Sequence, residues 1–135
     1  PCVALGAVDD RGGASPGLGV YLDRKGDDIL RVASGCLGFA RGPGIAIAID
    51  AFGDDVVAAG DWCLGASEAQ GFALYRDLTG NDRVVARRYS LGFARGALAF
   101  AIDDSGEDER VTLSSARGVG EGAGSGVFAD LKGTE

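Results

Sequence analysis

The chain has 135 residues, of which 24 are glycine and none is histidine or methionine, and its formal net charge is −7 at pH 7. This length fits a single domain, and the negative charge disfavours nucleic acid as a partner. Without histidine, the chain cannot form a Ser-His-Asp or Cys-His catalytic centre or a His-containing zinc site. No apolar run approaches the ~20 residues of a membrane span, and no signal peptide is visible.

Five similar turns, rich in Asp and Gly, divide the chain almost evenly. Their glycines are 27, 27, 26 and 27 residues apart, at Gly26, Gly53, Gly80, Gly106 and Gly133. We therefore divide the chain into repeats 1–25, 26–52, 53–79, 80–105 and 106–132, with 133–135 completing the first repeat. This period predicts one domain of repeated units, each of which buries its apolar face only against its neighbours.

Each repeat predicts one strand before its turn and another after it. Large and small apolar residues alternate before the turn, as in Ile-Ala-Ile-Ala-Ile at 45–49 and Leu-Ala-Phe-Ala-Ile at 98–102. Alanine on one face and isoleucine or phenylalanine on the other indicates that both faces are covered or closely approached. The strands after the turn are expected at 29–33, 56–59, 83–86 and 110–113. Leu37, Leu64 and Leu91, each followed by glycine, predict a short third strand or an inward-packed arch.

Alignment of the repeats gives three apolar columns, as a shared core requires. The first contains Val3, Leu30, Val57, Val84 and Val111. The second contains Leu5, Val32, Ala59, Ala86 and Leu113. The third contains Val20, Ile47, Leu74, Phe100 and Val127.

The turn chemistry favours antiparallel hairpins. An Asp that caps the turn and a glycine three residues later fit a type I turn with a G1 bulge, which joins neighbouring antiparallel strands. The last turn has no strand after it and the first strand has no turn before it, so pairing of 2–5 with 125–129 would close the chain. We therefore expect an all-β ring of five β-hairpin repeats, barrel- or propeller-like, without exposed edges. The alternative is a parallel β-solenoid of about five coils.

The three cysteines are too few for a disulfide scaffold, so buried free thiols are expected. Cys36 and Cys63 occupy equivalent positions in consecutive repeats, and their separation distinguishes the two folds. Their Cα atoms would lie ~10 Å apart in a hairpin ring, where a strand intervenes, and ~4.8 Å apart in a parallel solenoid.

One aligned column contains two large aromatic residues among smaller ones: Val8, Gly35, Trp62, Tyr89 and Ala116. Aromatic rings beside polar groups can stack a sugar or another flat ligand. Polar residues stand in nearby columns, so we expect a ligand site formed by Trp62, Tyr89, Asp61, Glu68, Arg41 and Arg95. The alternative is that Trp62 and Tyr89 only fill space that the other repeats leave to smaller residues.

These features favour a non-catalytic, lectin-like binding or recognition module whose ligand is a carbohydrate or another small molecule. A second interpretation is a structural protein that assembles into a homo-oligomer. A third is a carboxylate-dependent hydrolase, although nearly all the acidic residues fall in the turns. The sequence identifies no catalytic residue and no cofactor motif, and the acidic turns lack the ligand number of a calcium motif. The cellular compartment stays open.

Overall fold

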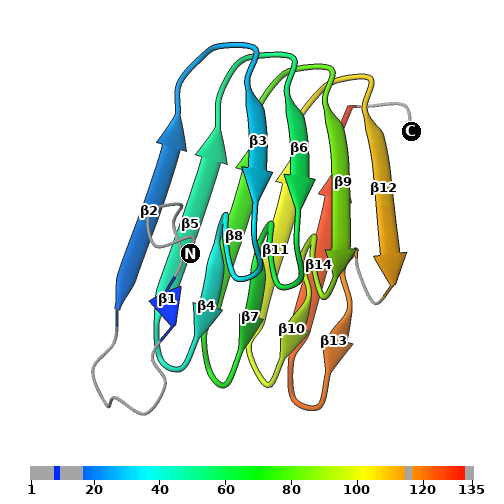
Figure 1. Ribbon diagram of the computed structural model, residues 1–135. Helices are drawn as coiled ribbons and strands as arrows, with labels where there is room; N and C mark the ends of the chain where they lie inside the picture. Colours follow the sequence, from blue (N-terminus) through cyan, green and yellow to red (C-terminus); the bar gives the residue numbers. More distant parts are fainter. Residues whose placement is uncertain (1–7, 10–16, 115–116, 133–135) are drawn as a thin grey trace.

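A computed structural model describes residues 8–9, 17–114 and 117–132, and the structural statements below concern these residues. Their strands stack as a parallel β-solenoid of about four coils (Figure 1). Within these ranges no helix is long and apolar enough to cross a membrane. The all-β prediction is therefore confirmed in its solenoid form, and the closed hairpin ring is wrong.

Three parallel sheets run along the solenoid (Figure 1). The Ile/Ala sheet contains β2 (Leu18–Asp23), β5 (Ile45–Asp50), β8 (Phe72–Asp77), β11 (Leu98–Asp103) and β14 (Ser125–Asp130). The facing sheet contains β3 (Ile29–Val32), β6 (Val56–Ala59), β9 (Arg83–Arg88) and β12 (Glu109–Ser114). The short sheet contains β1 (Val8–Asp9), β4 (Phe39–Arg41), β7 (Ala66–Glu68), β10 (Ala94–Arg95) and β13 (Gly120–Glu121).

Strand pairing shows why the hairpin prediction is wrong. The Ile/Ala sheet pairs in parallel, with Leu18 opposite Ile45, Ile45 opposite Phe72, Phe72 opposite Leu98 and Leu98 opposite Ser125. Each Asp-x-x-Gly turn therefore carries the chain across to the facing sheet, not back along a neighbouring strand. Glycine is needed because the coils stack closely: a Cβ on Gly53 would overlap the carbonyl oxygen of Gly26. Asp and Gly are typical both of turns that join antiparallel neighbours and of turns that lead to a facing sheet, so turn chemistry alone did not distinguish a hairpin from a solenoid.

The predicted ring closure is also wrong. β14 pairs with β11, and β2 and β14 lie at opposite edges of the Ile/Ala sheet. Segment 125–129 therefore completes a stack of strands and does not close a hairpin. Its predicted partner, 2–5, lies outside the described residues.

The apolar columns are confirmed in part. Leu30, Val57 and Val84 are stacked as predicted, but the step to the next coil is 26 residues, so Arg110 pairs with Val84 in place of Val111. Thr112 replaces Leu113 in the second column for the same reason, and Val111 and Leu113 are exposed. The third column is in the predicted register, but it faces outward, with Val20 57% exposed. Val3 and Leu5 lie outside the described residues.

The core lies between the Ile/Ala sheet and the facing sheet. Successive coils contribute alternately large and small inward side chains, namely Tyr21, Ala48, Tyr75, Ala101 and Phe128. Coils stack at ~4.8 Å, so an alanine leaves room for the ring above or below it. Leu37, Leu64 and Leu91 are buried in the core, which confirms the inward-packed arch.

The cysteines agree with the solenoid. The backbones of Cys36 and Cys63 pair as an isolated parallel β-bridge between consecutive coils, as expected for a solenoid. Cys63 is a buried free thiol, as predicted, and burial raises its pKa to about 11. Cys36 is disulfide-bonded, so the prediction of a free thiol is wrong there. Cys2 lies outside the described residues.

Candidate ligand-binding site

A ladder of alternating charges crosses the short sheet. Arg41, Glu68, Arg95 and Glu121 are neighbours in register on consecutive strands. Arg41 forms an ion pair with Glu68, and Arg95 Nε lies 3.0 Å from Glu121 Oε2. The hydrogen bond to Glu121 raises the pKa of Arg95. Both guanidinium groups are thus fixed by a carboxylate on an adjacent strand.

Four aromatic rings gather beside this ladder, and we call Phe39, Trp62, Tyr89 and Phe93 the aromatic cluster. The Trp62 ring centroid lies 4.8 Å from that of Tyr89, 5.2 Å from Phe93 and 5.9 Å from Phe39. Tyr89 and Phe93 are 4.9 Å apart. The two phenylalanines are buried, whereas Trp62 and Tyr89 are half-buried. The cluster therefore has a packed base and a partly accessible upper layer.

Arg95 joins the ladder to the cluster. Its Cζ atom lies 5.1 Å from the Trp62 centroid, 5.4 Å from Tyr89 and 5.8 Å from Phe93. These distances are within the ~6 Å of a cation–π interaction. The Arg95 side chain is still 46% exposed. Arg95 thus holds its guanidinium donors over the aromatic rings, where part of the side chain is accessible.

The backbone at the two central rings is unusual for bulky residues. Trp62 and Tyr89 have φ values of 60° and 57°, in the left-handed region. Gly35 occupies the equivalent position one coil earlier, with φ 74°. A left-handed conformation costs a residue with a side chain about 1–2 kcal/mol, and glycine avoids this cost. Contacts made by the Trp62 and Tyr89 rings must therefore offset local strain.

Five of the six residues predicted for the site lie in this region. Trp62, Tyr89 and Arg95 are in direct contact, while Glu68 and Arg41 continue the charge ladder. Asp61 instead pairs with Arg87 and Arg88 of β9, at 3.7 and 3.3 Å.

The column that suggested the site is correct only in its centre. Gly35, Trp62 and Tyr89 align on consecutive coils. Val8 does not align with Gly35, because it pairs with Ala40 of β4. Ala116 lies outside the described residues.

The sequence-based prediction missed the base of the cluster. Phe39 and Phe93 belong to two copies of Leu-Gly-Phe-Ala-Arg-Gly, at 37–42 and 91–96. The intervening coil has Ala66 and Glu68 at the corresponding positions. An identical hexapeptide two repeats apart was therefore the signal that could have identified Phe39 and Phe93.

A second polar region lies inside the solenoid, at the Asp-x-x-Gly turns. One row of buried carboxyl groups ends the strands of the Ile/Ala sheet, and a second follows the turn: Asp50, Asp77 and Asp103, then Asp55, Asp82 and Asp108. In the second row, each carboxylate accepts a hydrogen bond from the backbone N–H of the equivalent aspartate one coil earlier. The N–H groups of Asp28, Asp55 and Asp82 lie 2.6, 2.6 and 2.7 Å from the carboxylates of Asp55, Asp82 and Asp108, respectively. Burial, with the neighbouring carboxylates, raises the pKa of Asp50 to about 7 and that of Asp77 to about 9. These two side chains therefore hold protons that ordinary aspartates release.

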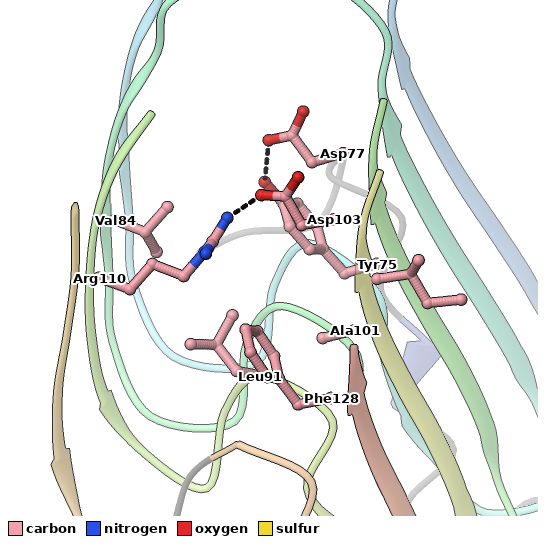
Figure 2. A pocket seen from close by; sticks show the side chains of 9 residues that line it. Tyr75, Asp77, Val84, Leu91, Ala101, Asp103, Arg110 and Phe128 are labelled. Carbon is pink, nitrogen blue, oxygen red and sulfur yellow. Dashed lines mark hydrogen bonds and ion pairs between the residues drawn. The ribbon is translucent and has the colours of Figure 1, made fainter. Parts of the chain in front are cut away.

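At the next coil a buried arginine, Arg110, lies among the carboxyl groups. Arg110 reaches inward to Asp103 (Figure 2). Its guanidinium also lies 2.6 Å from Asp108 and 3.1 Å from Asp130. The adjoining cavity, between Tyr75, Asp77 and Phe128, has a volume of about 10 Å³. A cavity of this size holds one water molecule and no sugar. The carboxylates of the second row connect consecutive coils through backbone hydrogen bonds.

In the described part of the chain, no group of three or more Asp, Glu or Cys side chains is placed to hold a metal ion. Comparison with protein-family models, curated proteins and solved structures finds no match to this chain. The functional assignment therefore rests on its own residues.

Proposed function

We propose that this solenoid is a non-catalytic binding module whose ligand stacks on the aromatic cluster. The observation that carries the proposal is the contact of Arg95 with Trp62 and Tyr89 on adjacent coils. A partly exposed guanidinium over half-buried rings combines an apolar surface with hydrogen-bond donors. This combination suits a flat ligand with polar edges.

A carbohydrate is the ligand class that fits best. The apolar face of a sugar stacks on aromatic rings, while its hydroxyl groups need both donors and acceptors. Arg95 supplies donors, and Glu68 and Glu121 on either side supply acceptors. All three are side chains of the short sheet, so a ligand can bind without a change of fold.

Tryptophan fluorescence provides a direct test, because Trp62 is the only tryptophan in the chain. Sugars identified on a glycan array are titrated, and quenching of Trp62 emission gives the dissociation constant. We expect Trp62→Gly, followed by calorimetry, to weaken binding at least about tenfold, equivalent to about 1.4 kcal/mol. Glycine is chosen because Gly35 shows that this backbone position accepts it.

Two further measurements separate a ligand site from a purely structural cluster. Phe52→Ala removes another exposed aromatic ring, 58% exposed, from the turn side of the solenoid and should leave binding unchanged. A structural role alone predicts that Trp62→Gly costs about 3–5 kcal/mol of stability, as for other emptied aromatic sites. Such a loss, with no sugar retained on the array, would overturn the proposal.

A further inference from the structure

The outward face of the Ile/Ala sheet is apolar, and none of the described residues covers it. Alternate residues of its strands point away from the core, as Ile45, Ile47 and Ile49 do on β5 and Leu98, Phe100 and Ile102 on β11. The alanines between them are buried. Leu18, Ile45 and Leu98 are 70%, 45% and 46% exposed. The large side chains thus face away from the core and the small ones face into it.

This face is also nearly free of charge. Arg76 is the only charged side chain that points outward from the described strands of the sheet, and its guanidinium lies 2.6 Å from Asp104. The facing sheet differs, because Arg31, Arg83 and Arg87 are exposed on its outer surface. Parallel sheets are usually covered on both faces. A covering partner for the Ile/Ala sheet must therefore be apolar.

We propose that this face binds the same face of a second copy of the chain, forming a two-fold symmetric dimer. Five six-residue strands, ~20 Å long and ~4.8 Å apart, give a face of about 500 Å² before side-chain relief is added. A specific interface needs about 500 Å² or more from each partner. The uncovered face therefore meets the area that a dimer requires.

The spacing of the side chains favours a second copy over other partners. Outward side chains repeat at the strand spacing of ~4.8 Å, so their ridges match the grooves of an identical sheet. A membrane surface is disfavoured, because binding to anionic lipid requires clustered basic residues. Here the one basic residue of the face, Arg76, is already paired with Asp104. The aromatic cluster lies beside the short sheet, so dimerisation does not depend on the proposed ligand site.

Sedimentation equilibrium on the whole chain tests the proposal. The wild-type protein is expected to have a mass near twice the 13.6 kDa of one chain. Leu74→Lys places a charge on β8, the central strand, at a half-buried outward position. The lysine ammonium group is solvated in the monomer, but in the dimer it would be buried without an opposite charge. Dimerisation should therefore weaken about 100-fold or more. Val85→Lys, on the outer surface of β9, is the matched control and should remain dimeric.

Three results would overturn the proposal. One is a wild-type monomer at about 200 µM, which would leave the face to a different protein or to a lipid surface. Another is a Leu74→Lys variant that stays dimeric. The third is equal loss of the dimer in Leu74→Lys and Val85→Lys. Circular dichroism checks that each variant is folded, and Phe100→Lys on β11 replaces Leu74→Lys if the latter is not.

Discussion

The protonated aspartates inside the solenoid predict an unusual dependence of stability on pH. Asp77 is 5% exposed, and its folded-state pKa of about 9 lies well above that of an unfolded aspartate. Between these two values only the folded chain keeps the proton, so unfolding releases it. The free energy of unfolding then falls by about 1.4 kcal/mol per pH unit for each such proton. The stabilisation is complete below pH ~4, and it is lost as pH rises towards the folded-state value.

The side chain of Asp77 is hydrogen-bonded to that of Asp82, and Asp77→Asn removes the titrating proton while keeping a side-chain donor for this bond. The variant should match the wild-type protein near pH 5 and exceed its stability by about 4–5 kcal/mol at pH 8.5, because the wild-type protein loses ~1.4 kcal/mol with each pH unit in between. Urea denaturation at pH 5.5, 7 and 8.5 measures the difference. Asp54→Asn is the matched control, because Asp54 is exposed in the same kind of turn and Asn81 occupies its position one coil later. Equal pH slopes in wild-type and Asp77→Asn proteins would refute the interpretation that Asp77 is protonated in the folded protein.

Two other substitutions test the stacking of the coils. Arg110→Met should lower the free energy of unfolding by about 3–5 kcal/mol at pH 7, because the buried carboxylates lose their cation. Its control is Arg83→Met, which breaks the exposed Arg83–Glu109 ion pair and should cost less than about 1 kcal/mol in the same thermal unfolding assay. Gly80→Ala should lower the free energy of unfolding by about 3 kcal/mol or more, because the new Cβ would overlap the carbonyl oxygen of Gly53. Its control is Gly96→Ala, where a Cβ meets open space, and this variant should lose about 1 kcal/mol. Urea denaturation measures both losses. Similar losses within either pair would contradict the packing described here.

The repeat length, the strands and the candidate site could be predicted from local sequence, but strand direction could not. An Asp-x-x-Gly turn has the same local chemistry whether its strands pair with each other or face each other across a core. The difference depends on non-local contacts, such as the carboxylate of Asp82 that accepts the backbone hydrogen bond of Asp55. Aspartates recurring at one position are easier to explain in a parallel stack, where each carboxylate reaches the next coil.

The shift at Arg110 shows a second limit. The turn glycines already indicated a step of 26 residues, between Gly80 and Gly106, but the first two apolar columns continued at 27. Hydrophobicity favoured Val111 as the buried residue, and Val111 is 43% exposed. A buried arginine is expected only where carboxylates surround it, and two of these carboxylates, Asp103 and Asp130, come from other strands. Their positions could not be known without the register.

The backbone of the solenoid repeats with every coil, but some of its side chains repeat only with every second coil. This difference determines how often a ligand site can occur along it. Tyr21, Ala48, Tyr75 and Ala101 alternate large with small inside, while Arg41, Glu68, Arg95 and Glu121 alternate in charge outside. At ~4.8 Å spacing, like charges on every coil would repel, and large rings on every coil would not fit inside the packed core. Alternation avoids both, but it makes adjacent coils inequivalent. A ligand site built from two neighbouring coils, as at Trp62 and Tyr89, therefore occurs at one place along the described solenoid and is not repeated on every coil.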